Sequence, residues 1–375
     1  MVFVRSLSGV SRLALGAFAA AGLTLCTGLD ARAQETATPP PLRSLSRTDL
    51  LELPPRQGVP PRAENARHWE ARRREAVAGF LSVTGLLPRG KRCDLALKVE
   101  EEVDCGSFVR RRISYESTPG GRVPAFLCIP KAALAGKAVP AVLCLHPTDN
   151  VVGNGVVVGL GGKPNRQYAS ELAERGFVTL APAYPLLADY QPDLAALGFE
   201  SGTAKAVWDN IRGLDLLQTF PFVRTEKGFA AIGHSLGGHN SIFTAVLDAR
   251  VRVVVSSCGF DSFLDYMNGN IKGWTQLRYM PSLEKFLGRP EEVPFDFYEL
   301  IAALAPRHVF INAPLGDSNF NHASVRRIVQ AALPVFELHS ARDNLMVLHP
   351  DCAHDFPDSV RFASYDLISA VLGAP

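Results

Sequence analysis

The stretch AAIGHSLGGHN, residues 230–240, decides the fold of this chain. Its central pentapeptide, GHSLG at 233–237, matches the G-x-S-x-G pattern in which a serine occupies a sharp turn between a strand and a helix. An apolar run, GFAAI at 228–232, precedes the turn, and a helical pattern begins at about Leu236. We therefore predict that Ser235 is lifted above a sheet edge, between glycines that leave no room for larger side chains.

Ser235 needs a base, because a serine hydroxyl is a weak nucleophile at neutral pH. In this strand–turn–helix context the catalytic partners follow in the chain order serine, acid, histidine. His354, in PDCAHDFP at 350–357, precedes the terminal helical stretch, which is where the base is expected. His349 is the alternative by position.

Three other histidines are less suited to act as the base. His239 lies on the helix that follows Ser235, and we expect it to point away from the hydroxyl. His308 is expected to open a strand and His339 to end one.

The acid that orients the base should follow the next-to-last central strand. The run HVFINAP at 308–314 is that strand, and Asp317 comes soon after it. Asp261, after the preceding strand, and Asp343, after the following one, stay open as alternatives. An aspartate in such a position can also be a turn or helix-capping residue.

The developing oxyanion needs two backbone N–H donors. The residue after the nucleophile, Leu236, is expected to supply one of them. The second should follow the strand in AVLCLHPT at 141–148, and because Pro147 has no N–H, Thr148 is the expected donor. This chemistry requires neither a metal nor an organic cofactor.

Short apolar runs alternate with helical stretches from about residue 108 onward. This alternation predicts an α/β fold with a mostly parallel central sheet and helices on both faces. The expected helices include residues 64–80, read as a polar surface helix, 167–176 and 203–219. The expected strands are 108–115, 123–129, 139–146, 177–183, 228–234, 251–258 and 308–314.

One long connection, residues 259–305, is dense in aromatic residues, glycine and proline. It is either a cap over a binding cleft or a surface excursion. In the first case Trp274, Tyr279 and Met280 are candidates for lining the cleft. In the second case they pack against the core.

The first 33 residues have the three parts of an export signal. A basic start precedes the apolar run LALGAFAAAGLTL at 13–25, and the cleavage site fits Ala31 to Ala33. The run is shorter than the ~20 residues that a membrane span needs. Attachment of lipid at Cys26 is an alternative. We expect a periplasmic or secreted protein with a proline-rich arm at 34–63 and a catalytic domain at 64–375.

Composition excludes several classes of function. The formal net charge of +2 and the lack of a basic stripe with aromatic residues argue against a nucleic-acid partner. The glycine-rich stretch at 152–164 matches neither a P-loop nor a dinucleotide-binding fingerprint, and we interpret it as a loop at the cleft mouth. Oligomeric state is unreadable. An exported chain can form disulfides, and Cys93 with Cys105 is the expected pair.

The chain resembles the α/β-hydrolase superfamily, and within it the branch that is similar to dienelactone hydrolases and acetyl xylan esterases. The resemblance covers about residues 105–373 and rests on GHSLGG at 233–238, WDNIRGLDLL at 208–217, APLGDSNF at 313–320 and PDCAHDFP at 350–357. It implies a Ser235, Asp317 and His354 triad. The chain departs from many members at 146–148, where it has HPT.

Three functions fit these observations. The first is an exported serine esterase, with small-molecule or carbohydrate esters, acetyl esters among them, as substrates. The second is a peptidase of the same mechanism, similar to the prolyl oligopeptidase catalytic domain. The third is a binding protein without catalytic activity on a hydrolase scaffold, because fold alone does not establish function.

Overall fold

The computed structural model of this chain describes residues 45–53, 55, 58 and 60–374. The expected export signal at 1–33, with Cys26, lies outside the described residues, as does the beginning of the expected arm at 34–63. The described residues all belong to one compact unit, which runs from Pro39 to Pro375. No helix among them is both long and apolar enough to cross a membrane.

The central sheet has ten strands in the described residues, in the order β1-β2-β3-β5-β4-β7-β8-β9-β10, and β6 pairs with β4 off this path. The strands are β1 Lys98–Asp104, β2 Phe108–Thr118, β3 Gly121–Pro130, β4 Val139–Leu145, β5 Val178–Pro182, β6 Val223–Arg224, β7 Phe229–His234, β8 Val251–Ser257, β9 His308–Asn312 and β10 Leu345–Leu348. The pairs from β5 through β4, β7, β8 and β9 to β10 are parallel. The strands β1, β2 and β3 join antiparallel at one edge. The predicted mostly parallel sheet is therefore confirmed.

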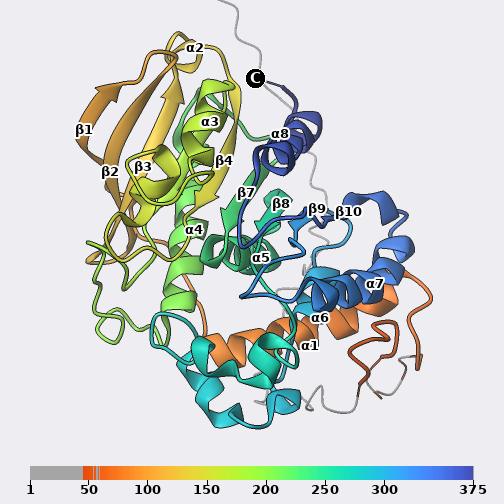
Figure 1. Cartoon of the computed structure of the whole chain (residues 1–375). Coiled ribbons are helices and arrows are strands. Elements are labelled where there is room, and N and C mark those ends of the chain that lie inside the picture. The colour runs from red at the N-terminus through yellow and green to blue at the C-terminus, as the bar shows by residue number, and fades with distance from the viewer. Residues whose placement is uncertain (1–44, 54, 56–57, 59, 375) are drawn as a thin grey trace, which may run out of the picture. The chain divides into compact units, whose positions relative to one another are not determined.

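The helices cover both faces of this sheet (Figure 1). They are α1 Ala66–Thr84, α2 Lys131–Leu134, α3 Tyr168–Glu174, α4 Gly202–Thr219, α5 Leu236–Leu247, α6 Phe297–Ala302, α7 His322–Leu338 and α8 Asp358–Leu372. Apolar side chains of α1, α4, α5, α6 and α7 join one core cluster, and those of α3 and α8 join another.

Strand β4 shows why these strands are apolar along their whole length. Ala141 and Leu143 belong to the first core cluster, whereas Val142 and Cys144 belong to the second. Successive side chains of a strand point to opposite faces, so a strand covered by helices on both sides buries every residue. All seven residues of β4 are buried.

The long connection at 259–305 consists mainly of short 3₁₀ turns. They are η3 Tyr266–Gly269, η4 Ile271–Trp274, η5 Pro281–Phe286 and η6 Pro290–Glu292, and they lead into α6. Further turns of this kind are η2 Gly153–Val158 and η7 Arg342–Asn344. The first part of the glycine-rich stretch, η2, is buried as a packed turn, whereas residues 159–164 form an exposed loop.

Two sequence interpretations of helices are wrong. The apolar run before His339 is the end of helix α7, which contains Pro334, and not a strand. Helix α1 is not a polar surface helix, because Trp69, Arg72 and Glu75 are all buried. The expected disulfide is also wrong, since Cys93 and Cys105 are both free thiols.

The described part of the arm at 34–63 packs on helix α1. Leu50 and Leu53 are buried, and the indole N–H of Trp69 donates to the Leu50 carbonyl at 2.9 Å. The Arg72 guanidinium donates to the carbonyls of Asp49 at 2.7 Å and Glu52 at 2.9 Å. Burial of the cationic Arg72 is tolerated because these carbonyls accept from its terminal nitrogens and the Glu299 carboxylate lies 3.5 Å away.

Candidate active site

Ser235 stands between the end of β7 and the first residue of α5, with φ 54° and ψ −118°. This backbone conformation is rare for a residue with a side chain and is typical of strained functional positions. The Ser235 N–H donates to the Ser257 carbonyl at 2.8 Å, which ties the turn to the neighbouring strand β8. The predicted strand–serine–helix turn is confirmed.

The glycines on either side of Ser235 are required by close packing. A Cβ atom on Gly233 would lie 2.1 Å from the Gly237 carbonyl carbon. A Cβ atom on Gly237 would lie 1.9 Å from the Leu145 carbonyl oxygen on β4. Because real Cβ contacts are longer than 3 Å, no side chain fits at either position, as the sequence predicted.

His354 and Asp317 lie side by side. The imidazole Nδ1 of His354 is 2.9 Å from both carboxylate oxygens of Asp317. The Asp317 side chain is 1% exposed, and its Oδ1 also accepts the N–H groups of Asn319 and Phe320. Burial alone would raise the pKa of Asp317. The hydrogen bond from His354, the positive charge of the His354 ring and the two backbone N–H groups together lower this pKa below its usual value.

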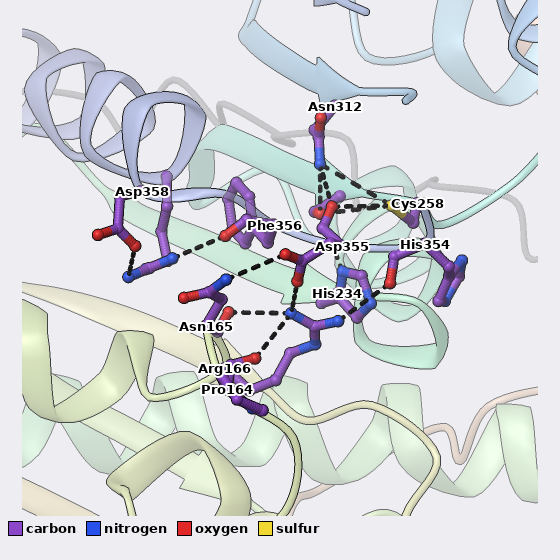
Figure 2. Close-up of polar contacts among 12 residues, drawn as sticks. Pro164, Asn165, Arg166, His234, Cys258, Asn312, His354, Asp355, Phe356 and Asp358 are labelled. Atoms are coloured by element: carbon purple, nitrogen blue, oxygen red, sulfur yellow. Dashed lines mark hydrogen bonds and ion pairs between the residues drawn. The ribbon is translucent and has the colours of Figure 1, made fainter. Parts of the chain in front are cut away.

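Arg166 holds the loop that carries His354 (Figure 2). Its guanidinium donates to the His354 carbonyl at 3.1 Å and to a carboxylate oxygen of Asp355 at 2.6 Å. Asn165 donates to the other Asp355 oxygen at 3.0 Å. The side chain of Arg166 is 4% exposed, so this charge-assisted contact is shielded from water.

The same loop is held from the sheet side. The Asn312 side chain, at the end of β9, donates to the Asp355 carbonyl at 2.8 Å, and the Cys258 thiol approaches the same oxygen at 3.3 Å. Figure 2 shows both contacts converging on this residue. The backbone on the C-terminal side of His354 is therefore fixed from two directions.

Ser235 and His354 border a common cavity of about 250 Å³, which we call the His354 pocket. The Arg166 clamp and the basic Lys163 lie on its wall. Its lining residues are Pro147, Thr148, Asp149, Val156, Lys163, Arg166, His234, Ser235 and His354.

A second cavity of about 80 Å³ meets the first at Ser235 and Thr148, and we call it the Trp274 pocket. Its wall combines the start of α5 with residues of the 259–305 connection. Its lining residues are Thr148, Ser235, Leu236, His239, Tyr266, Gly273, Trp274, Tyr279, Asn319 and Phe320.

The 259–305 connection therefore has both of the roles that the sequence left open. Trp274 and Tyr279 border the Trp274 pocket. Met280 is buried in the core and is not one of the described residues that line either cavity. His239 was expected to point away from Ser235, but it lines the Trp274 pocket beside it.

Among the described residues, the alternative acid and base residues line neither cavity at Ser235. Asp261 accepts the Asn321 N–H at 2.9 Å, and Asp343 is exposed in η7, before β10 rather than after it. His349 pairs through Nδ1 with the Ala313 carbonyl at 2.7 Å. Burial raises the pKa of Asp261 to about 8, so it is mainly protonated at neutral pH.

The two expected oxyanion donors lie next to Ser235. Leu236 is buried at the N-terminus of α5, where the free N–H groups of a helix point toward incoming negative charge. Thr148 borders both cavities, and its hydroxyl lies 3.0 Å from that of Tyr279. The roles of these two N–H groups stay predictions.

One group of side chains has the composition of a metal site. The donor atoms of His234, Cys258 and His354 lie within 4.8 Å of one another. Burial raises the pKa of the Cys258 thiol well above its usual value, and only a thiolate is a strong metal ligand. The cluster therefore fits a metal poorly, and it shares His354 with the Asp317 pair.

No protein-family model and no curated protein matches this chain. Solved structures do match it. A glucuronoyl esterase from Solibacter usitatus superposes with a TM-score of 0.68 at 19% identity, over 87% of this chain and 98% of that one. A carbohydrate esterase family 15 glucuronoyl esterase from Caldicellulosiruptor kristjansonii gives 0.61 at 17% identity, over 86% and 90%.

An acetyl xylan esterase from Paenibacillus sp. R4 gives a TM-score of 0.53 at 17% identity, over 86% of this chain and 98% of that one. The likeness extends over nearly the whole described unit, and the mostly parallel sheet and the serine turn are those expected from the sequence. This chain has the α/β-hydrolase fold that these esterases share.

Proposed function

We propose that this protein is a serine carboxylic ester hydrolase that uses Ser235, His354 and Asp317. The observation that carries the proposal is the 2.9 Å pairing of His354 with Asp317 at the cavity that Ser235 also borders. A nucleophile on a strained turn, a histidine and an orienting carboxylate are the three parts that acyl transfer needs.

The mechanism follows from these positions. Ser235 Oγ attacks the ester carbonyl while His354 Nε2 takes its proton, and Asp317 stabilises the imidazolium that forms. The N–H groups of Leu236 and Thr148 hold the oxyanion. His354 then protonates the departing alcohol, and a water molecule, activated by the same imidazole, releases the acid and restores Ser235.

We propose carbohydrate esters as the substrate class. The support is the likeness in fold to proteins named glucuronoyl esterase and acetyl xylan esterase. A wide cavity with Lys163 and Asp149 on its wall suits a polar alcohol such as a sugar hydroxyl. A screen over acetylated sugars, longer acyl esters and proline-containing peptides separates this class from the peptidase alternative.

We also propose that the protein is exported to the periplasm or the medium. The support is the signal pattern at 1–33, with a small-residue cleavage site before Gln34. N-terminal sequencing of the protein recovered from outside the cytoplasm should begin at Gln34. A chain that retains residue 1 would contradict this proposal.

The deciding experiment compares hydrolysis of 4-nitrophenyl acetate by the wild type and Ser235→Ala. We expect the variant to lose activity by about 10³-fold or more, because the nucleophile is removed. Ser82→Ala, an exposed serine on α1, is the matched control and should keep full activity. Equal rates for wild type and Ser235→Ala, or no labelling of the folded protein by a fluorophosphonate, would reject the proposal and favour a binding protein.

A further inference from the structure

Two cavities of different size meet at Ser235 and Thr148. Among the described residues, His354 borders the larger cavity and not the smaller one. An ester bound for attack has an acyl part and an alcohol part, and both extend from the carbonyl carbon that Ser235 reaches. The two cavities can therefore hold the two parts separately.

The position of His354 determines which part goes where. The imidazole that takes the Ser235 proton must later deliver it to the oxygen of the departing alcohol. The alcohol must therefore leave on the side of His354, which is the His354 pocket. The acyl group is left with the Trp274 pocket.

The size of the Trp274 pocket limits the acyl group. Its volume is about 80 Å³. An engineered cavity of about 150 Å³ accommodates benzene, so about half that volume suits a group of roughly three or four non-hydrogen atoms. Short acyl groups fit within this volume, whereas a chain of six carbons extends beyond the pocket.

Two of the residues that line this pocket, His239 and Trp274, each carry a polar atom without a partner. Among the described residues, His239 Nε2 and Trp274 Nε1 are buried and make no hydrogen bond. His239 is 5% exposed and Trp274 is 4% exposed, and their ring centroids lie 4.7 Å apart. Buried polar atoms of this kind are uncommon, because leaving them unpaired is unfavourable.

The chemistry of these two atoms is complementary. His239 Nδ1 lies 2.9 Å from the Gly259 carbonyl, which can only accept, so Nδ1 carries the proton and Nε2 is an acceptor. Burial lowers the pKa of His239 to about 4, which keeps the ring neutral at pH 7. Trp274 Nε1 is only a donor. A hydroxyl group, which both donates and accepts, matches this pair.

We propose that the Trp274 pocket is the acyl subsite and that it selects short acyl groups carrying a hydroxyl, of which glycolyl is the smallest. The inference rests on the proposed function. It assigns His239 and Trp274 to substrate recognition, a role that the sequence reasoning did not give to His239.

Ethyl glycolate and ethyl propionate test the hydroxyl, because their acyl groups differ only by OH in place of CH₃. Each kcat/KM is divided by the rate constant for alkaline hydrolysis of the same ester, which removes the difference in intrinsic reactivity. We expect the wild type to prefer glycolate by about tenfold after this correction, as for hydrogen bonds that the isostere cannot make.

Trp274→Phe removes Nε1 and keeps an aromatic ring. We expect it to reduce the glycolate preference by about fivefold, because propionate has no hydroxyl whose hydrogen bond could be lost. His239→Leu, which removes the acceptor, gives an independent second measurement if Trp274→Phe does not fold. Lys163→Met, in the His354 pocket, is the control and should leave the preference unchanged. Equal corrected values for the two esters, or an equal effect of Trp274→Phe on both, would overturn the hydroxyl assignment.

Ethyl hexanoate and hexyl acetate test which pocket takes which part. We expect hexyl acetate to be hydrolysed and ethyl hexanoate to be at least tenfold slower, because the long chain fits only on the alcohol side. The reverse order would overturn the side assignment. Failure of the wild type to hydrolyse any ester would instead reject the proposed function itself, so the two failures are distinguishable.

Discussion

His354 presents Nδ1 to Asp317 at 2.9 Å from each carboxylate oxygen, although the two residues are 37 positions apart in the sequence. The pairing leaves Nε2 as the ring nitrogen that takes the Ser235 proton in the mechanism we propose, because the carboxylate holds the proton on Nδ1. It also shows why an acid after β9 serves this histidine: the loop after β9 and the loop after β10 leave the sheet at the same edge.

Asp317→Asn should lower kcat by about 10³- to 10⁴-fold, because an amide can stabilise the wrong tautomer of His354 and cannot stabilise its charged form. Steady-state kinetics on 4-nitrophenyl acetate measures the loss. The matched control is Asp343→Asn, an exposed aspartate that was an alternative acid from the sequence. A comparable loss in Asp343→Asn, or none in Asp317→Asn, would show that the acid is misassigned.

Arg166→Met should lower kcat more than it changes KM, because Arg166 holds the backbone of His354 and not the substrate carbonyl. A displaced base costs up to about 10²-fold in rate. Lys137→Met, which removes an exposed positive charge elsewhere, is the control. The two constants distinguish the roles of Arg166. A loss mainly in kcat indicates that Arg166 positions His354, whereas a change mainly in KM would indicate that its charge acts on the bound substrate.

Gly237→Ala should unfold or inactivate the protein, because its Cβ would lie 1.9 Å from the Leu145 carbonyl oxygen. We expect a loss of about 2 kcal/mol or more in the free energy of unfolding. Gly288→Ala is the control for backbone strain without a clash. Gly288 has φ +76°, but no atom lies within 4 Å of the added Cβ. Denaturant unfolding of the two variants should give the smaller loss for Gly288→Ala.

Asp261→Asn should be more stable than the wild type above neutral pH. Burial raises the pKa of Asp261 to about 8, against an ordinary value of 3.8. Between these values the folded protein holds a proton that the unfolded chain releases, so the stability of the wild type falls as pH rises, by at most about 1.4 kcal/mol per pH unit. Asparagine does not titrate and can still accept the Asn321 N–H.

Denaturant unfolding of wild type and Asp261→Asn at pH 5, 7 and 9 measures this difference. The stability gained by the variant should grow from pH 5 to pH 7 and level off above about pH 8. A difference that does not change with pH would mean that Asp261 is ionised in the folded protein.

Much of this fold could be predicted because its central strands are apolar throughout, and the seven strands expected between residues 108 and 314 all occur. The edge strands β1 and β10 were missed. Strand β1 is mostly exposed and charged, so it has no apolar pattern to detect. The end of α7 was predicted as a strand, because a short apolar run is too brief to show whether its apolar residues repeat with the spacing of a helix or of a strand.

The site was predictable only in part. The turn at Ser235 depends only on neighbouring residues, so the sequence pattern at 233–237 was enough to predict it. The direction of His239 is not local, since it depends on how α5 is rotated against the 259–305 connection and on Trp274 within it. The burial of Arg72 likewise depends on carbonyl groups of the preceding arm, which no helical pattern reveals.

The docking of the arm on the body of the protein has a practical consequence. Arg47 forms an ion pair with Asp296 at 2.8 Å and donates to the Val293 carbonyl at 2.6 Å, and Asp296 accepts the Ser262 hydroxyl at 2.7 Å. Ser262 lies near the start of the 259–305 connection, and Val293 and Asp296 lie in its last part. Residues of this connection form part of the wall of the Trp274 pocket. A shortened chain that starts at residue 64 would lose these contacts, so recombinant production should preserve everything after the proposed cleavage site if native selectivity is to be measured.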